Sequence, residues 1–161
     1  MGTTVTTIRA MTVDDVAEVA AMEAAQQPRP WSEKVLGDEL SADGRIYLVA
    51  EDESGIVGFG GVMVIGEEAH VANLLVGPAS RRQGIGRRIM LDLIEAAVAA
   101  GARHLTLEVR KENPGARARY AGLGLAPVGV RPRYYGDDDA LILWAHDIDR
   151  PEYLEGLRWS R

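Results

Sequence analysis

The sequence predicts an α+β fold built on one sheet that is antiparallel except around a single crossover, and three observations support this class. Strand-like and helix-like segments follow one another in the order β, α, α, β, β, β, α, β, α, β, β. Three of the strands succeed each other across short turns, which is typical of an antiparallel meander. One strand, helix and strand in the middle form a crossover, which joins parallel strands.

The N-terminal half contains the two helices and the meander. TTIRAM alternates as a short strand, and the segment after it opens with Thr12 and two acids before an apolar helical pattern. Ser32 is the expected N-cap of a second helix within PWSEKVLGDEL. The three strands of the meander are rich in valine, isoleucine and aromatic residues and are expected at residues 45–52, 55–65 and 68–77.

The C-terminal half begins with a strongly amphipathic segment. Residues 85–100 carry two adjacent apolar stripes at i, i+4 spacing and predict a helix that stops at Gly101. A strand at 103–110 and a short helix that ends near Gly122 or Gly124 follow. The last two expected strands are APVGVRPRYY, residues 126–135, and DDALILWAHDI, residues 138–148.

Length and composition bound the class of protein. With 161 residues, 47% of them hydrophobic, the chain fits one domain, residues 1–147, with an extension at 148–161. No segment resembles a membrane span or a secretory signal, so a cytoplasmic protein without a membrane partner is expected. The absence of cysteine excludes disulfides and cysteine nucleophiles. A formal net charge of −6 argues against nucleic acid as a direct partner.

A basic glycine loop, RRQGIGRR at residues 81–88, stands out in this acidic chain. It precedes a predicted helix, so its backbone N–H groups lie at the positive end of a helix dipole and can bind an anion. Gly84 and Gly86 allow a phosphate to approach the main chain closely. A helix terminus with solvated arginines is the alternative. A dinucleotide fingerprint would need a third glycine, and a nucleoside-triphosphate loop would need Gly-Lys-Ser/Thr.

The same loop resembles the acyl-coenzyme A pyrophosphate loop of the GNAT superfamily of N-acetyltransferases. Arg81, Gly84 and Gly86 fill its pattern Gln/Arg-x-x-Gly-x-Gly/Ala. NLLVGPASRRQGIGRR, LEVRKENPGARARYAGLGL and VRPRYY arrive in the family's order, and PWSEK is similar to a segment of the RimI-type ribosomal-protein N-terminal acetyltransferases. The resemblance implies a GNAT fold, a central mixed, mostly antiparallel sheet with helices on both faces and a splayed parallel strand pair, HVANLLV and HLTLEVR.

The resemblance also implies that acetyl-coenzyme A is the co-substrate. A main-chain N–H near Leu75 would polarise the thioester carbonyl. Asn113 matches a cofactor-contacting asparagine, although Asn-Pro is also an ordinary signal for the start of a helix. The implied cofactor contacts are Leu74, Leu75, Val76, Arg82, Gln83, Gly84, Ile85, Gly86, Arg87 and Asn113.

Two residues are implied to carry the chemistry. Glu108, in LTLEVR, matches a general base that removes a proton from the attacking amine, and its alternative is a surface glutamate paired with Arg110 or Arg103. Tyr120, in ARARYAGLGL, matches a general acid that protonates the leaving thiolate, and its alternative is a packed core tyrosine. With no cysteine to carry an acyl group, transfer is expected to be direct, in a ternary complex.

The expected acceptor is a protein N-terminus, because Trp31, Tyr134 and Tyr135 are similar to residues that line the RimI-type peptide groove. An acidic protein suits a basic ribosomal-protein tail. Gly77, Ser80, Leu125 and Pro132 depart from the family's usual residues, so acceptor specificity has room to differ. Monomer and dimer stay open, and for the extension so do capping of the sheet, dimerisation and disorder.

No metal is expected, since His70, His104 and His146 lie in different predicted strands without the spacing of a metal site. The run Asp137–Asp139 is interpreted as a hairpin turn, with calcium as the alternative. Other functions remain open: a small-molecule amine N-acetyltransferase of the same fold, a non-catalytic acyl-coenzyme A-binding module, and a plain nucleotide-binding protein.

Overall fold

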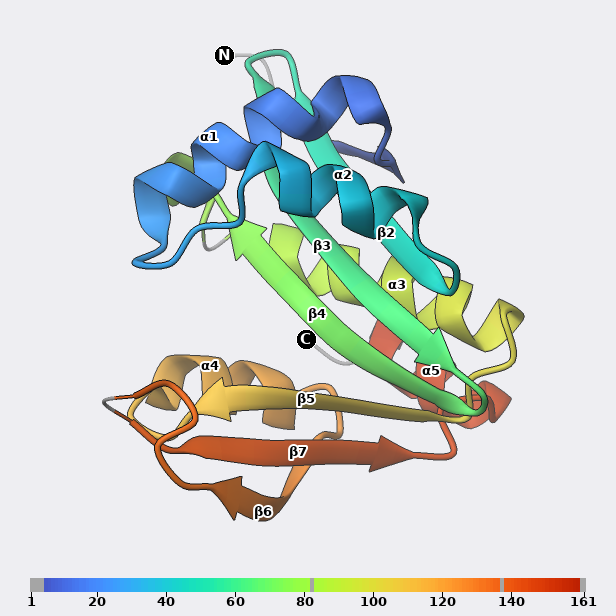
Figure 1. The fold of residues 1–161 in the computed structure, drawn as a ribbon. Coiled ribbons are helices and arrows are strands. Elements are labelled where there is room, and N and C mark those ends of the chain that lie inside the picture. The colour runs from blue at the N-terminus through green and yellow to red at the C-terminus, as the bar shows by residue number, and fades with distance from the viewer. Residues whose placement is uncertain (1–4, 82, 137, 160–161) are drawn as a thin grey trace. The chain divides into compact units, whose positions relative to one another are not determined.

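The computed structural model describes residues 5–81, 83–136 and 138–159 (Figure 1). The chain divides into two compact units, one of residues 1–63 and 72–96 and the other of residues 64–71 and 97–161. Strand β4 (Glu68–Val76) begins in the second unit and ends in the first. No helix among the described residues is long and apolar enough to cross a membrane.

The first unit contains strands β1 (Thr7–Ala10), β2 (Arg45–Asp52) and β3 (Gly55–Ile65) beside the end of β4. β1 and β2 are antiparallel, and so are β2 and β3, with Val49 opposite Phe59. Figure 1 shows β3 and β4 running in opposite directions, so the predicted meander is confirmed.

Helices cover both faces of the strands in the first unit. α1 (Val16–Gln26) and α2 (Glu33–Ser41) lie on one face, where Val19, Leu36 and Phe59 are almost fully buried in a shared core. α3 (Ile85–Ala99) lies on the other face, where a Cβ on Gly60 would meet Ile89 at 2.9 Å. Gly60 therefore lets α3 approach the strands closely, because it has no side chain that would stand between the helix and the sheet.

The second unit contains β5 (His104–Arg110) between the start of β4 and strand β7 (Ala140–His146), with β6 (Ala126–Arg131) beyond. β4 and β5 are parallel, with Ala69 opposite Leu105, whereas β5 and β7 are antiparallel, with Leu107 opposite Leu143. The predicted mixed, mostly antiparallel sheet with one parallel pair is therefore confirmed.

Two helices belong to the second unit. α4 (Pro114–Ala121) follows β5, and α5 (Pro151–Trp159) closes the chain. The Tyr153 hydroxyl of α5 donates a hydrogen bond of 2.5 Å to the Leu123 carbonyl, just after α4. The C-terminal extension thus forms a packed helix, which the sequence analysis did not predict.

Most of the sequence signals that predicted where helices and strands begin and end agree with the structure. Ser32 accepts a hydrogen bond from the Val35 amide, as a helix N-cap does, and Gly101 has the positive φ, 104°, of a C-terminal stop. The strand predicted for residues 126–135 is too long, since β6 ends at Arg131 and residues 132–135 form a turn. Pro132 explains the difference, because proline has no N–H to donate to a strand partner.

Candidate active site

The glycine loop of the first unit has the geometry of an anion site. Gly84 has a φ of 74°, and a Cβ placed on it would meet nothing within 4 Å. The Arg88 amide donates a hydrogen bond of 3.0 Å to the Gly84 carbonyl, so the amides of Ile85 and Gly86 precede the bonds within α3. Open space beside the N–H groups that begin a helix suits the binding of an anion such as a phosphate.

Arg81 fixes the loop to its surroundings. Its Nε donates to the Val76 carbonyl at 3.2 Å, and a terminal nitrogen donates to Gln26 Oε1 of α1 at 2.6 Å. Gln83 and Gly84 are exposed and Arg87 is half-buried. Arg82, which the sequence analysis also placed on the cofactor, lies outside the described residues.

The end of β4 is held by a hydrogen bond between a buried acid and a half-buried asparagine, which the sequence analysis missed. Asn73 donates a hydrogen bond of 2.8 Å from Nδ2 to Glu23 Oε1 of α1, and its Oδ1 accepts one of 2.9 Å from the Leu74 amide. Glu23 is 1% exposed, and burial raises the pKa of its carboxyl, although Asn73 and the Trp31 amide oppose this. The only sequence signal was an acid within the apolar stretch of α1.

Leu75 is 8% exposed in the core of the first unit, beside half-buried Leu74 and Val76. Trp31 precedes α2 and packs against the same core, with its ring 6.5 Å from the ring of Tyr47 in an edge-on arrangement. Trp31 therefore has a packing role in addition to the acceptor contact predicted for it.

In the second unit, four of the predicted residues, Glu108, Tyr120, Tyr134 and Tyr135, lie close together. Burial raises the pKa of Tyr135 to about 12, and the charges of Tyr134, Glu108 and Tyr120 add to this shift while Arg110 opposes it. Burial also raises the pKa of Tyr120, which is 9% exposed on α4. A tyrosine in this state keeps its proton at neutral pH, as a proton donor must.

Glu108 is partly accessible on β5, with 26% of its side chain exposed, and Oε1 lies 3.7 Å from a terminal nitrogen of Arg131. Arg131 of β6 is thus a cationic neighbour of Glu108 that the sequence analysis did not name. At this distance and exposure the ion pair is weak, so it leaves the carboxylate available to another hydrogen-bond donor.

The tyrosine pair is contacted by arginines from β5 and β6, the two strands on either side of β7. The Arg110 guanidinium lies 4.4 Å from the Tyr135 ring centroid, and that of Arg131 lies 5.7 Å from the Tyr134 ring centroid. The two tyrosine rings meet edge to face at 5.0 Å. The sequence analysis named Arg110 only as a possible partner of Glu108 and did not mention Arg131, because the contacts of both with the tyrosines depend on how the sheet pairs its strands.

The acidic run after the tyrosines stabilises the turn. Asp138 accepts hydrogen bonds from the Glu112 and Asp139 amides, and Asp139 accepts one of 2.9 Å from the Arg133 amide. Asp137 lies outside the described residues. The hairpin-turn interpretation is supported for Asp138 and Asp139, since their carboxylates bind main-chain amides.

Asn113 is the N-cap of α4, where its Oδ1 accepts a hydrogen bond of 3.1 Å from the Ala116 amide. The ordinary helix-start role is therefore present. The cofactor contact stays a prediction, for which the Nδ2 donor would serve.

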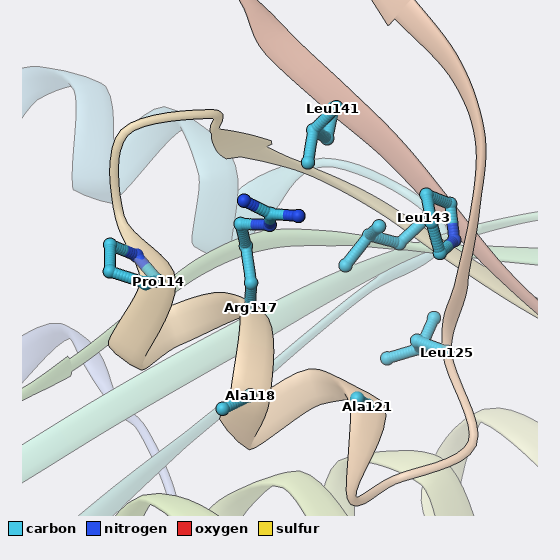
Figure 2. A pocket seen from close by; sticks show the side chains of 8 residues that line it. Pro114, Arg117, Ala118, Ala121, Leu125, Leu141 and Leu143 are labelled. Atoms are coloured by element: carbon cyan, nitrogen blue, oxygen red, sulfur yellow. The ribbon is translucent and has the colours of Figure 1, made fainter.

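A cavity of about 420 Å³ also lies in the second unit, between α4 and strands β6 and β7 (Figure 2). Figure 2 shows the Arg117 side chain extending from α4 toward Leu141 and Leu143. Tyr120 is not among the lining residues, so this cavity lies apart from the predicted proton donor. Its walls are Pro114, Arg117, Ala118, Ala121, Leu125, Pro127, Leu141 and Leu143.

Comparison with known proteins shows the class of protein to which this fold belongs. Residues 16–125 match the model of the acetyltransferase (GNAT) family. The chain belongs to this family, which confirms the resemblance found in the sequence.

Particular relatives are N-terminal acetyltransferases. The [ribosomal protein bS18]-alanine N-acetyltransferase of Salmonella typhimurium is 32% identical over 142 residues, 85% of this chain and 95% of the relative. The N-alpha-acetyltransferase RimI of Mycobacterium tuberculosis is 34% identical over 135 residues, 80% of this chain and 84% of the relative. The crystal structure of the Escherichia coli ribosomal-protein-S18-alanine N-acetyltransferase superposes with a TM-score of 0.81 at 28% identity, covering 89% of this chain and 94% of that one.

Proposed function

We propose that this protein transfers an acetyl group from acetyl-coenzyme A to the N-terminal α-amine of a ribosomal protein, with an N-terminal alanine in bS18 as the first acceptor to test. Identities of 32% and 34% to bS18-alanine and N-alpha acetyltransferases support the acceptor class. The observation that supports the chemistry is that the second unit holds a partly exposed carboxylate, Glu108, and a buried phenol, Tyr120.

Acetyl-coenzyme A would supply an activated thioester. The amides of the glycine loop, Gln83 to Arg87, would bind its diphosphate, and Arg82 would add charge. The main chain of Leu74, Leu75 and Val76 would orient the pantetheine arm, and the Leu75 amide would stabilise negative charge on the carbonyl oxygen.

Glu108 would accept a proton from the acceptor's ammonium group, directly or through one water, which leaves the neutral amine that attacks. An α-amino group has a pKa of roughly 8, so little help from a base is needed at neutral pH. Tyr120 would donate its phenolic proton to the departing sulfur. Its raised pKa keeps that proton in place until the thiolate forms.

Trp31, Tyr134 and Tyr135 would hold the first residues of the acceptor chain. Aromatic side chains give large contact area at low entropic cost, since each has two rotatable bonds. Of the pair, Tyr134 is 50% exposed and so is the better placed to meet a peptide.

The test is turnover of acetyl-coenzyme A at neutral pH, measured by thiol release, on a bS18-like peptide, the same peptide with a blocked N-terminus, free amino acids and polyamines. We expect turnover of the free peptide only, with kcat reduced about a hundredfold or more in Glu108→Gln and Tyr120→Phe. Equal rates on the blocked peptide would overturn the N-terminal assignment, and activity on small amines alone would establish the small-molecule alternative.

A further inference from the structure

All three histidines of the chain lie in the second unit, and the strand register brings them onto one face of its sheet. His104 of β5 is opposite His146 of β7, while Thr106 is opposite both His70 and Trp144. Opposite residues share a face, and so do residues two apart along a strand. Separation in sequence therefore concealed a cluster that the sheet assembles.

Within this cluster, His104 and His146 meet through the same ring atom. The two Nδ1 atoms are 3.1 Å apart in an exposed position, with the ring planes inclined by 73°. Of two neutral imidazoles in this arrangement, one Nδ1 carries a hydrogen that it donates to the lone pair of the other. A lone pair that faces a second ring nitrogen at this spacing is also what a metal ion requires.

The spacing fits two ligands of one ion. Zinc binds imidazole nitrogen at about 2.0–2.1 Å, and two such ligands at a tetrahedral angle are roughly 3.3–3.4 Å apart. The observed 3.1 Å needs an adjustment of only a few tenths of an ångström. Replacing the shared hydrogen with the ion therefore requires rotation of the rings, without movement of the strands.

The neighbours hold the pair in place. The Trp144 ring stacks on His146 with a centroid distance of 5.6 Å and an angle of 11°, and the His70 ring meets Trp144 edge-on at 6.4 Å. His70 therefore contacts the tryptophan rather than the histidine pair. Rigid strands and a stacked ring reduce the entropy lost when an ion binds.

We propose that His104 and His146 form a two-histidine binding site for a divalent transition metal ion, with water completing the coordination. Two imidazoles suit Cu²⁺, Ni²⁺ and Zn²⁺, with Cu²⁺ bound most tightly, and do not suit Mg²⁺ or Ca²⁺, which take oxygen ligands. Among the described residues no group of three or more potential protein ligands gathers, so the protein supplies two. The site is separate from the proposed acetyl transfer and does not depend on it.

The test is titration of the full-length protein with Cu²⁺ in a non-chelating buffer at pH 7.5. Electron paramagnetic resonance should show coupling to two nitrogens, and fluorescence should be quenched because Trp144 lies beside the ion. We expect His104→Gln and His146→Gln each to lose tenfold or more in affinity together with the two-nitrogen signal. His70→Gln, the matched control, should bind within twofold of the wild type.

Unchanged Cu²⁺ affinity in His104→Gln and His146→Gln would overturn the proposal, as would an equal loss in His70→Gln. A measurement without any variant guards against misfolding: adding Zn²⁺ to the wild type should shift the ring resonances of His104 and His146 in NMR spectra and leave those of His70 near their places. Shifts at none of the three, or at all three equally, would also overturn it.

Discussion

At the scale of single residues, Glu23 is a buried acid for which the described part of the chain provides no ion-pair partner. One carboxyl oxygen accepts from Asn73, and the other, Oε2, has no partner among the described residues. The cost of keeping this group ionised in the folded protein raises its pKa above the ordinary value of 4.5. As pH rises past the ordinary value, the unfolded chain ionises first, so folding loses stability.

Glu23→Gln removes that loss. We expect the free energy of unfolding of the variant, relative to wild type, to increase steadily from about pH 4.5 toward neutrality. Urea unfolding at several pH values measures it. The control is Glu33→Gln, which replaces an exposed acid on α2. A difference that does not vary with pH would show that Glu23 titrates normally.

Residue roles differ in how far the sequence reveals them. Ser32 could be predicted because a cap acts on an amide three residues away. Glu23 and Asn73 could not, since they are 50 residues apart and meet only through the packing of α1 on β4. The histidine pair, 42 residues apart, was missed for the same reason.

At the scale of elements, the glycine loop before α3 has a matched control in the β3–β4 turn. Gly84 and Gly66 both have positive φ, 74° and 58°, and a Cβ on either would meet nothing within 4 Å. Alanine at either position should cost about 1 kcal/mol of stability, because the left-handed conformation disfavours a side chain.

Of the two variants, only Gly84→Ala should also weaken the binding of acetyl-coenzyme A. Its Cβ would occupy the space beside the loop amides, so we expect KM for acetyl-coenzyme A to rise about tenfold, by roughly 1.4 kcal/mol of lost binding, while Gly66→Ala leaves KM unchanged. Steady-state kinetics and thermal unfolding of both variants measure this. Equal KM values in the two variants would place the diphosphate elsewhere.

The cavity beside α4 predicts an asymmetry between two buried leucines. Leu125 lines the cavity and Leu107 does not. Leu125→Phe has room for the larger ring and should keep or raise stability, by up to about 1 kcal/mol, because it buries more apolar surface. Leu107→Phe should cost about 1–3 kcal/mol through overpacking. Denaturant unfolding compares them, and equal destabilisation would show that the cavity does not accept the ring.

The elements that the sequence analysis missed or mis-sized have physical causes. α5 was missed although its nine residues form an amphipathic pattern, and Tyr153 anchors the helix through a carbonyl 30 residues away. The strand predicted at β6 was too long because the prediction gave more weight to its β-branched residues than to Pro132. The parallel pairing of β4 with β5 was predictable, because a helix joins them and helical crossovers join parallel strands.

At the scale of the whole molecule, charge is distributed unevenly along the sequence. The formal net charge is −6, yet four arginines lie within residues 81–88, the loop proposed for the anionic cofactor. The net negative charge would attract a basic acceptor peptide, and the arginines of the loop would attract the anionic cofactor. Both attractions would speed the encounter with the protein over distances comparable to the Debye length.

This distribution predicts a salt dependence that separates the two substrates. With acetyl-coenzyme A saturating, KM for an acceptor peptide with a lysine- and arginine-rich tail should rise several-fold between about 0.02 and 0.3 M salt, because the Debye length falls from about 20 Å to under 6 Å. A peptide with the same first residues and a neutral tail should change less than twofold. If both peptides respond equally, the net negative charge of the protein takes no part in acceptor binding, and recognition depends on the N-terminal residues alone.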